Sequence, residues 1–312
     1  MRSSTATGTT ATARPVGDRY RGRFAPSPTG ALHLGSLLTA VGSYLDARGA
    51  GGEWLVRIED VDRAREVEGA ADAILRTLER FGLDWDGPVL HQSARSEAYR
   101  AALETLAGLD LTYNCSCSRS DHGAGETPER RYPGTCRAGP TRLGLPVATR
   151  FRVDGAGPVT IEDRLQGPYT QSVDLAVGDF LLRRRDGFWS YQLAVVVDDA
   201  YQGITDVVRG LDLLDNTPRQ RLLQAALGVP QPRLLHLPLL TEADGQKLSK
   251  SRRALPADLA AAPATLTRVL ALLRHEPPRE LHGAPVREQL AWAGMAWNPS
   301  LLQGLRNVFA NS

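Results

Sequence analysis

Residues 21–36 read RGRFAPSPTGALHLGS, and this stretch predicts a strand, a loop and a helix in that order. Pro26 and Pro28 cannot donate to a sheet ladder, so we expect the strand to end before them. Apolar residues then recur at helical spacing from residue 34 onward, and Gly49 is placed to end the helix. The free N–H groups and the positive dipole end of such a helix favour a bound phosphate, so the loop is a candidate nucleotide site.

The residues of this loop suit close contact with a nucleotide. Gly30 and Gly35 lack a Cβ, so a nucleotide can approach the backbone, and His33 could donate to phosphate oxygens. A loop rich in proline and glycine before a helix is also a common plain connection. The loop alone therefore leaves the function open.

The only two lysines of the chain indicate a second phosphate contact. Lys247 and Lys250 lie together in the sequence KLSKS. The chain has 37 Lys and Arg residues, and all except these two are arginine. An ammonium is a compact point charge on a flexible stem, suited to following a phosphate as it leaves. A solvated surface turn would accept arginine equally well, so the use of lysine here predicts a functional loop.

Together, PSPTGALHLGS and KLSKS resemble the two signatures of the class I aminoacyl-tRNA synthetases, and the RFAPSPTG lead-in is similar to the glutamyl branch. In that family the first signature lies under ATP and the second closes over its phosphates. Ser36 stands where many class I enzymes have a second histidine, as is usual for the glutamyl type. The chain has neither a Walker motif nor a Gly-x-Gly-x-x-Gly after a strand, which disfavours other phosphate loops.

The resemblance implies two sets of residues around ATP. The catalytic residues that it implies are His33, Lys247 and Lys250. The ATP-binding residues that it implies are Pro26, His33, Gly35, Ser36 and Lys250. The nucleotide is expected to bind with Mg²⁺.

Glu59 lies near the end of the strand expected over residues 53–60, and acids at the ends of parallel strands face the ligand crevice. Glu59 is therefore a candidate to hold a substrate ammonium. A plain ion pair with Arg57 or Arg63 is the alternative that periodicity leaves open. The resemblance favours the first interpretation, because the matching acid of the RIED motif contacts the amino acid in the glutamyl family.

The resemblance also implies that the tyrosine of YQLA and the arginine of VRG bind the amino acid. These residues are Tyr191, which could otherwise be core packing, and Arg209. With Arg23 they offer two guanidiniums and a phenol to a substrate with two carboxylates, as glutamate requires. Which arginine takes which carboxylate stays open. The implied glutamate-binding set is Arg23, Phe24, Ala25, Pro26, Ser27, Glu59, Tyr191 and Arg209.

The three cysteines of the chain, Cys115, Cys117 and Cys136, lie close together in a segment rich in glycine and proline. Three cysteines cannot all pair as disulfides, so the cluster predicts a structural Zn²⁺ in a reducing compartment. General chemistry nominates His122 as the fourth ligand. Glutamyl-queuosine members of the family have a Cys-x-Cys followed by a Tyr-x3-Cys, which implies Tyr132, and we expect Tyr132. Three unrelated free cysteines are the remaining alternative.

Composition predicts one large globular domain with smaller attachments, because 312 residues with 42% hydrophobic content can bury a full core. No apolar run reaches the length of a membrane span. The net charge of +2 does not announce a nucleic-acid partner, so RNA contacts would come from local arginine clusters. The expected segments are a disordered tail at 1–18, a nucleotide-binding catalytic domain at 19–110 and 186–256, a zinc-containing, acceptor-binding-like insertion at 111–185, and a helical region at 257–312.

Local patterns predict further elements. Helices are expected over residues 66–81, about 96–106, 265–274 and 286–297, and strands over 150–153, 159–163 and 234–240. Asp186-Gly187 predicts a hairpin turn within residues 178–191. Another helix is expected to begin with Thr217 as its cap and Pro218 at its first position, and to end at Gly228.

The fold class that follows is α/β, a Rossmann-like parallel sheet of the class I synthetase type with a small zinc-binding insertion and a short helical C-terminal region. That region is too short for the anticodon-binding region of a full glutamyl-tRNA synthetase. The resemblance therefore implies ATP-dependent activation of L-glutamate and its transfer to queuosine in the anticodon loop of tRNA(Asp), by a cytoplasmic monomer without membrane contact. The alternatives are a truncated glutamyl-tRNA synthetase that charges the tRNA 3′ end, and a non-catalytic paralogue.

Overall fold

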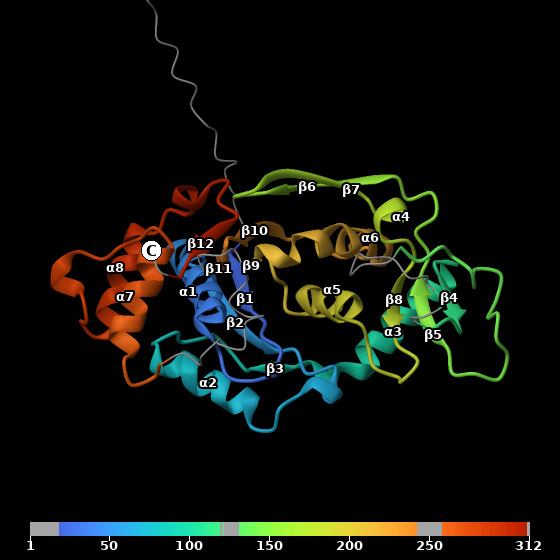
Figure 1. The fold of residues 1–312 in the computed structure, drawn as a ribbon, viewed down its shortest axis with the longest axis horizontal. Helices are drawn as coiled ribbons and strands as arrows, with labels where there is room; N and C mark the ends of the chain where they lie inside the picture. Colours follow the sequence, from blue (N-terminus) through green and yellow to red (C-terminus); the bar gives the residue numbers. More distant parts are fainter. Residues whose placement is uncertain (1–18, 119–120, 122–130, 242–257, 311–312) are drawn as a thin grey trace, which may run out of the picture.

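A parallel sheet forms the centre of the protein in the computed structural model, which describes residues 19–118, 121, 131–241 and 258–310 (Figure 1). Strands β10, β9, β1, β2 and β3 lie side by side in that order, and the step from β9 to β1 includes a hydrogen bond from the N–H of Thr205 to the Arg21 carbonyl (3.0 Å). The predicted α/β architecture with a parallel sheet is confirmed. The central strands are β1 (Arg21–Phe24), β2 (Glu53–Ile58), β3 (Leu90–His91), β9 (Asp206–Gly210) and β10 (Arg233–Leu237).

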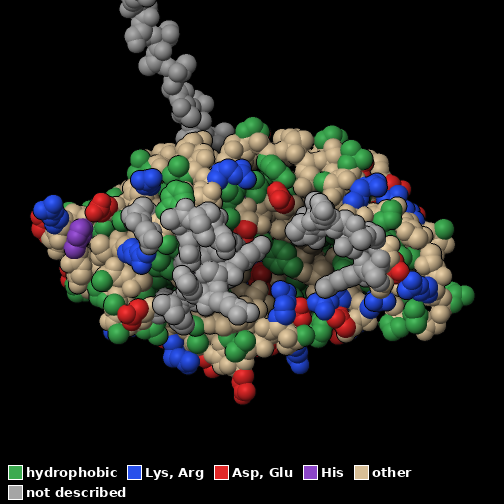
Figure 2. Space-filling model, in the orientation of Figure 1, with side chains coloured by type: hydrophobic (Ala, Val, Ile, Leu, Met, Phe, Trp, Pro, Cys, Tyr) green, Lys and Arg blue, Asp and Glu red, His purple; other side chains and the backbone are tan. Residues whose placement is uncertain are grey.

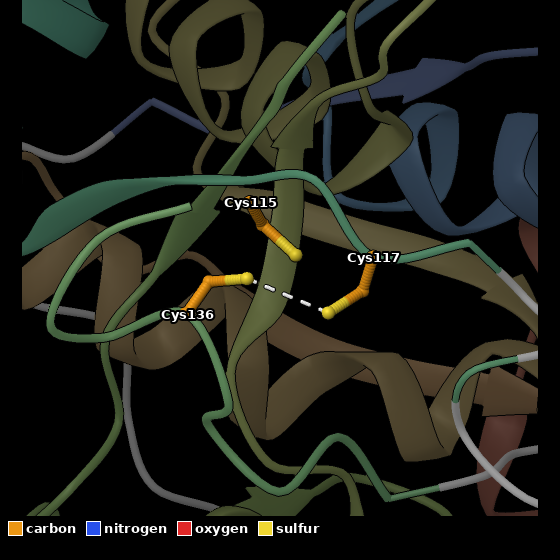
Figure 3. Close-up of side chains that lie close together, drawn as sticks. All are labelled: Cys115, Cys117 and Cys136. Atoms are coloured by element: carbon orange, nitrogen blue, oxygen red, sulfur yellow. Dashed lines mark hydrogen bonds between the residues drawn. The ribbon is translucent and has the colours of Figure 1, made fainter. Parts of the chain in front are cut away.

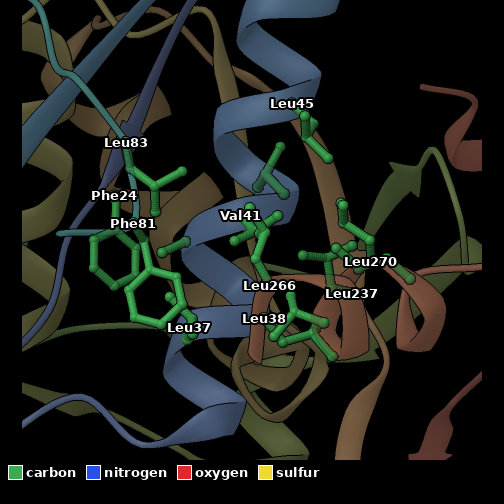
Figure 4. Close-up of a cluster of buried hydrophobic side chains, with 14 of the residues drawn as sticks. Phe24, Leu37, Leu38, Val41, Leu45, Phe81, Leu83, Leu237, Leu266 and Leu270 are labelled. Carbon is green, nitrogen blue, oxygen red and sulfur yellow. The ribbon is translucent and has the colours of Figure 1, made fainter. Parts of the chain in front are cut away.

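Helix α1 (Leu34–Gly49) carries the main hydrophobic core, as the predicted strand, loop and helix require. Figure 4 shows Leu37 turned toward Phe24 and Phe81, on the side of the sheet and of α2 (Ala70–Arg80). Leu38 and Val41 face the other way, toward α7 (Ala262–Leu272) and the end of β10. Because both sides of α1 are buried, the loop that precedes it is held firmly against the sheet.

Several predicted helix boundaries differ from the structure, among them that of α7, which runs over Ala262–Leu272 rather than 265–274. Helix α2 begins at Ala70 rather than at residue 66, because Gly69 has a φ of 73° and cannot continue a right-handed helix. Helix α3 (Ser96–Gly108) extends slightly beyond its predicted end. The prediction that Thr217 caps α6 (Thr217–Leu227) is wrong: Asn216 holds the cap position, and the Thr217 hydroxyl accepts a hydrogen bond from Arg209 instead.

The two ends of the molecule have different architectures (Figure 1). At one end, α7 and α8 (Val286–Ala296) pack against α1. At the other end lies an antiparallel sheet, which we call the cysteine module because Cys115 ends its first strand. Its strands are β4 (Thr112–Cys115), β5 (Ala148–Phe151) and β8 (Phe180–Arg183). The predicted hairpin at Asp186-Gly187 is present, since the N–H of Arg184 donates to the Phe188 carbonyl (2.8 Å).

A long hairpin bridges the two ends. Strands β6 (Pro158–Asp163) and β7 (Gly167–Ser172) pair antiparallel, and β6 also pairs in parallel with β10. Short α4 (Val173–Ala176) then leads back toward the cysteine module. Residues 158–172 are thus hydrogen-bonded to the central sheet, although they are close in sequence to the cysteines.

Helices α5 (Tyr191–Tyr201) and α6 lie between the central sheet and the cysteine module in Figure 1. The strand predicted over residues 234–240 is divided at Pro238, which separates β10 from β11 (Leu239–Thr241). Strand β12 (Asn307–Phe309) pairs with β11, a strand that the helical prediction for residues 257–312 did not include. No helix in the described part of the chain combines the length and the apolar character that crossing a membrane requires.

Candidate active site

The described residues predicted to bind ATP and glutamate line one pocket of about 570 Å³ at the carboxyl ends of the central strands. Arg23 and Arg209 lie near the ends of β1 and β9, and Glu59 follows β2 directly. Tyr191 is the first residue of α5. Because parallel strands meet at the same edge of a sheet, residues far apart in the chain converge here. The predicted residues that line this pocket are Arg23, Phe24, Ala25, Pro26, Ser27, His33, Gly35, Ser36, Glu59, Tyr191 and Arg209.

His33 caps the N-terminus of α1 and contacts Ser36 through both ring nitrogens. The Ser36 N–H donates to His33 Nδ1 (3.2 Å), and the Ser36 hydroxyl lies 3.1 Å from His33 Nε2. In a neutral ring Nδ1 therefore carries no proton, and Nε2 is the nitrogen that can donate. A Cβ at Gly35 would lie 3.1 Å from His33 Cε1, so glycine here also leaves room for the histidine ring.

Two guanidiniums share one buried carboxylate next to the pocket, which one of the two, Arg23, lines. Asp199 Oδ1 lies 2.8 Å from a terminal nitrogen of Arg57 and 3.2 Å from Nε of Arg23. Burial opposes the charge of Asp199, but the two arginines outweigh burial and hold the pKa of Asp199 below its usual value. Asp199 was not among the predicted residues. The available signal was an acid inside the apolar run VVVDDAY of α5.

Glu59 is held less tightly than Asp199. Its carboxylate lies 3.5 Å from Arg57, so the plain ion pair that periodicity left open exists only at long range. Burial raises the pKa of Glu59, with Arg57 and Arg23 acting in the opposite direction. A buried acid with so little compensation can gain from a cation delivered by a ligand.

Arg209 is a buried guanidinium whose partners are all neutral. Nε donates to His236 Nε2 (3.0 Å), and the terminal nitrogens donate to the hydroxyls of Tyr191 (3.1 Å) and Thr217 (2.8 Å). No carboxylate within 4 Å pairs with Arg209 in the part of the chain that the structure describes. The charge of Arg209 is therefore available to an anionic ligand in the pocket.

A second cavity, of about 1070 Å³, adjoins the first and reaches the cysteine module. The two share Ser27, Glu59 and Tyr191, and the far wall of the larger cavity includes Tyr132 and Trp189. In Figure 2 this face of the molecule is hollowed near its centre. A ligand that extends out of the smaller pocket past Glu59 and Tyr191 would enter this larger cavity.

The three cysteines converge as predicted, with all Sγ atoms within 4.8 Å of one another (Figure 3). Cys117 Sγ lies 3.4 Å from Cys136 Sγ, and the Tyr132 hydroxyl lies 3.2 Å from Cys115 Sγ. Four ligands at Zn–S distances of about 2.3 Å would stand about 3.8 Å apart, so the cluster has the size of a tetrahedral site. Burial would raise the pKa of Cys136, but hydrogen bonds, the largest from the Thr141 backbone, lower it to about 5.

Asp179 fixes the cysteine module from within. It accepts hydrogen bonds from Arg137 (2.6 and 2.8 Å), from the Tyr113 hydroxyl (2.6 Å) and from the N–H of Val153 (2.9 Å). Burial opposes ionisation of Asp179, and these donors together keep its pKa below the usual value. The module is thus built around a saturated carboxylate as well as around the thiols.

Three residues named from the sequence lie outside the described residues. They are Lys247 and Lys250 of the KLSKS loop, and His122, the other candidate for the fourth zinc ligand.

The profile of the family described as "tRNA synthetases class I (E and Q), catalytic domain" matches residues 19–260. The chain belongs to this family of class I tRNA synthetases. The Glutamyl-Q tRNA(Asp) synthetase of Pseudomonas aeruginosa strain LESB58 is 54% identical over 282 residues, which cover 89% of this chain and 94% of that protein. The protein of the same name from Dechloromonas aromatica strain RCB is 53% identical over 283 residues, covering 89% of this chain and 94% of the relative.

Solved structures of the family agree with the fold. A glutamate tRNA ligase from Elizabethkingia meningosepticum, solved in complex with its amino acid, superposes with a TM-score of 0.77 at 25% identity. The match covers 93% of this chain and 67% of that ligase. The class I synthetase type of the parallel α/β fold is therefore confirmed.

Proposed function

We propose that this class I synthetase activates L-glutamate with ATP and transfers it to the queuosine base at the wobble position of tRNA(Asp). In the first step a glutamate α-carboxylate oxygen attacks the α-phosphorus of ATP, and pyrophosphate leaves. In the second step a hydroxyl of queuosine attacks the acyl carbon of glutamyl-adenylate, loses its proton, and AMP leaves. ATP enters as its Mg²⁺ complex, in which the metal offsets phosphate charge.

The observation that carries the proposal is the 570 Å³ pocket, in which the loop before α1 and the side chains suited to glutamate face the same space. Two relatives above 50% identity, over nearly their whole length, bear the name Glutamyl-Q tRNA(Asp) synthetase. Catalysis of adenylate formation is mainly a matter of holding two substrates in line, which such a shared pocket favours.

The polar groups of the pocket suggest how glutamate is held. Arg209 lacks a described carboxylate partner and contacts Tyr191, so we assign a glutamate carboxylate to these two residues. Arg23 already shares Asp199 with Arg57 and is assigned a secondary contact. Glu59, with its raised pKa, is assigned the substrate ammonium, because the added cation would favour the ionised carboxylate.

For ATP we keep the assignment of Pro26, His33, Gly35 and Ser36, all of which line the same pocket. Nε2 of His33 is the nitrogen that carries the proton in the neutral ring, since Nδ1 accepts from the Ser36 backbone, and it lies 3.1 Å from the Ser36 hydroxyl. Lys247 and Lys250 are proposed to contact the phosphates on the basis of sequence.

We assign the larger cavity to the acceptor. An unpaired RNA loop can splay out a base and offer its edges to side chains, whereas a base in a helix cannot be reached in this way. The cavity opens directly from Glu59 and Tyr191, where the activated carboxyl group would lie.

An anticodon stem-loop of tRNA(Asp) with queuosine at the wobble position, and with no acceptor end, should accept labelled glutamate. The same stem-loop with guanine at that position should not, because it lacks the hydroxyl-bearing ring that receives the glutamyl group. Transfer of radiolabelled glutamate to each RNA measures this directly.

Label that enters only full-length tRNA with an intact 3′ terminal adenosine would instead establish the truncated glutamyl-tRNA synthetase. If the protein shows no ATP–pyrophosphate exchange in the presence of glutamate and without RNA, that result would support the non-catalytic paralogue.

We further propose that Cys115, Cys117, Cys136 and Tyr132 hold a structural Zn²⁺. The spacing of the sulfur atoms and the position of the Tyr132 hydroxyl among them support this ligand set. A bound cation would also favour the thiolate forms, as it does at other zinc sites.

Elemental analysis of the purified protein should find about one zinc per chain, the content expected of one closed four-ligand site. Tyr132→Phe should lower the zinc content or the zinc affinity, because it removes the oxygen among the three thiols, and His122→Ala should leave both unchanged. Metal loss in the histidine variant alone would overturn the choice of Tyr132.

The domain division stays a proposal: a catalytic domain from residues 19–110 and 186–256, an insertion at 111–185, and a C-terminal region at 257–312. The pairing of β6 with β10 suggests one refinement, in which residues 158–172 are counted with the central sheet. We also propose that the protein is a monomer. We propose that it is cytoplasmic, because that compartment keeps thiols reduced for zinc and contains tRNA.

A further inference from the structure

A buried chain of three hydrogen-bonded polar side chains runs from the 570 Å³ pocket into the sheet. Arg209 of β9 and His236 of β10 are register partners, and Arg209 Nε lies 3.0 Å from His236 Nε2. His236 Nδ1 lies 2.6 Å from Asp163 Oδ2, at the end of β6. The side chains of His236 and Asp163 are fully buried. Arg209 alone of the three lines the pocket among the described residues.

Arg209 and Asp163, which contact His236 from its two sides, determine which ring nitrogen of the histidine carries the proton. Arginine can only donate hydrogen bonds, and an ionised aspartate can only accept them. His236 Nε2 must therefore be the bare nitrogen, and Nδ1 must carry the proton that is donated to Asp163. The ring is neutral and has one orientation, set by both neighbours.

Asp163 is itself held rigidly. Its Oδ1 accepts from the backbone N–H groups of Leu165 (3.0 Å) and Gln166 (2.9 Å), and Oδ2 accepts from the N–H of His236 (3.1 Å). Burial works against its charge, but the hydrogen bonds led by the His236 side chain keep the pKa of Asp163 below its usual value. The chain is thus anchored at its inner end by backbone donors.

The hydrogen bonds of Arg209 set the direction of its guanidinium. Nε of Arg209 is used by His236, and one terminal nitrogen each is used by Tyr191 and Thr217. Each terminal nitrogen carries a second N–H, and neither of these two is hydrogen-bonded to another described residue. They are the donors that a carboxylate in the pocket could use.

We propose that His236 and Asp163 are positioning residues for the glutamate site: the neutral His236 ring accepts the Nε proton of Arg209 and thereby fixes how the guanidinium meets the substrate carboxylate. The inference rests on the proposed function, because it takes glutamate to be the ligand of Arg209. It extends the site to two residues that touch neither substrate.

The arrangement makes glutamate binding sensitive to acid. His236 faces Asp163 from β6, Arg209 from β9 and the charge of Arg23 from β1. Burial lowers the pKa of His236 below its usual 6.5, with Asp163 opposing and Arg209 adding to the shift. The contact with Arg209 is therefore intact at neutral pH and is lost only in acid, as the pH falls through the lowered pKa of His236, because a proton on Nε2 would face the Arg209 N–H.

The test compares His236→Leu with His236→Gln. Leucine removes the acceptor, so the KM for glutamate in ATP–pyrophosphate exchange and the calorimetric Kd for glutamate should rise about tenfold, as for one buried hydrogen bond. Glutamine can accept from Arg209 and donate to Asp163, so its KM should stay within about threefold of the wild type. The KM for ATP should be unchanged in both, and the rise in glutamate KM at acid pH should vanish in His236→Gln.

His275→Gln is the matched control, since His275 is also buried and uses both ring nitrogens, with the Leu273 carbonyl (2.7 Å) and the Asn298 N–H (2.8 Å). It should behave as wild type. An unchanged glutamate KM in His236→Leu overturns the assignment, and so does a His236→Gln variant as impaired as leucine with the ATP KM raised as well. Wild-type protein that neither binds nor activates glutamate removes the proposed function and this inference together, whereas normal wild-type exchange with unaffected variants removes the inference alone.

Discussion

Arg209→Lys is expected to lower kcat/KM for glutamate in ATP–pyrophosphate exchange by a factor of about 10² to 10³. Lysine keeps the charge but cannot donate in the three directions taken by His236, Tyr191 and Thr217. Those buried groups would lose their hydrogen-bond donor, and the substrate carboxylate would lose the pair of N–H donors that the planar guanidinium holds in a fixed geometry. Losing one partner of a buried charged contact costs about 3–4 kcal/mol, which corresponds to the stated factor.

Arg233→Lys provides the matched control on the neighbouring strand β10. Arg233 pairs with Asp206 (2.7 Å) at the opposite end of the strand, where its side chain is 39% exposed. A charge-preserving change there should leave kcat/KM within about twofold, because Arg233 does not line the 570 Å³ pocket. If Arg209→Lys were also near normal, the carboxylate would have to bind elsewhere, with Arg23 as the first candidate.

Much of the site could be predicted because its signals are local in the sequence. Two prolines that end a strand, and a histidine and glycines before an apolar periodicity, predict a strand, loop and helix by themselves. Likewise, three cysteines within one short segment of the sequence are expected to lie close together in space. The structure places Arg23, Glu59, Tyr191 and Arg209 in one pocket, although the resemblance to a family, rather than any spacing, indicated that they belong together.

The supporting residues could not be predicted, because their partners depend on which strands become neighbours. Asp199 and His236 sit in apolar runs, where a polar residue signals burial and does not name its partner, and Asp163 stands between Glu162 and Arg164, where nothing marks it as buried. Only the register Arg209↔His236 and the pairing of β6 with β10 show that Asp163 stands behind Arg209. The β6–β7 hairpin was assigned by sequence proximity to the cysteines, yet its hydrogen bonds join it to the central sheet.

Gly178→Ala is expected to lower the free energy of unfolding of the cysteine module by about 3 kcal/mol or more. Gly178 has a φ of 72°, and a Cβ there would lie 2.0 Å from the carbonyl oxygen of Tyr132. The clash is with backbone, so no side-chain rotation can relieve it, and the conformational strain adds to it. The N–H of Tyr132 donates to the Val177 carbonyl (2.8 Å), so relief of the clash would break this contact and shift Tyr132 away from the thiols.

Gly155→Ala separates backbone strain from the clash. Gly155 has a similar φ of 76°, but nothing lies within 4 Å of the added Cβ, so the cost should be about 1–2 kcal/mol. Hydrogen exchange of residues 131–137 and 177–180 should accelerate strongly in Gly178→Ala and little in Gly155→Ala, with zinc content falling only in the former. Equal exchange in the two variants would mean that the close approach of Tyr132 to Gly178 does not hold the module together. Since Tyr132 also lines the larger cavity, the same variant should impair transfer to RNA more than glutamate activation, which uses the opposite side of the shared wall.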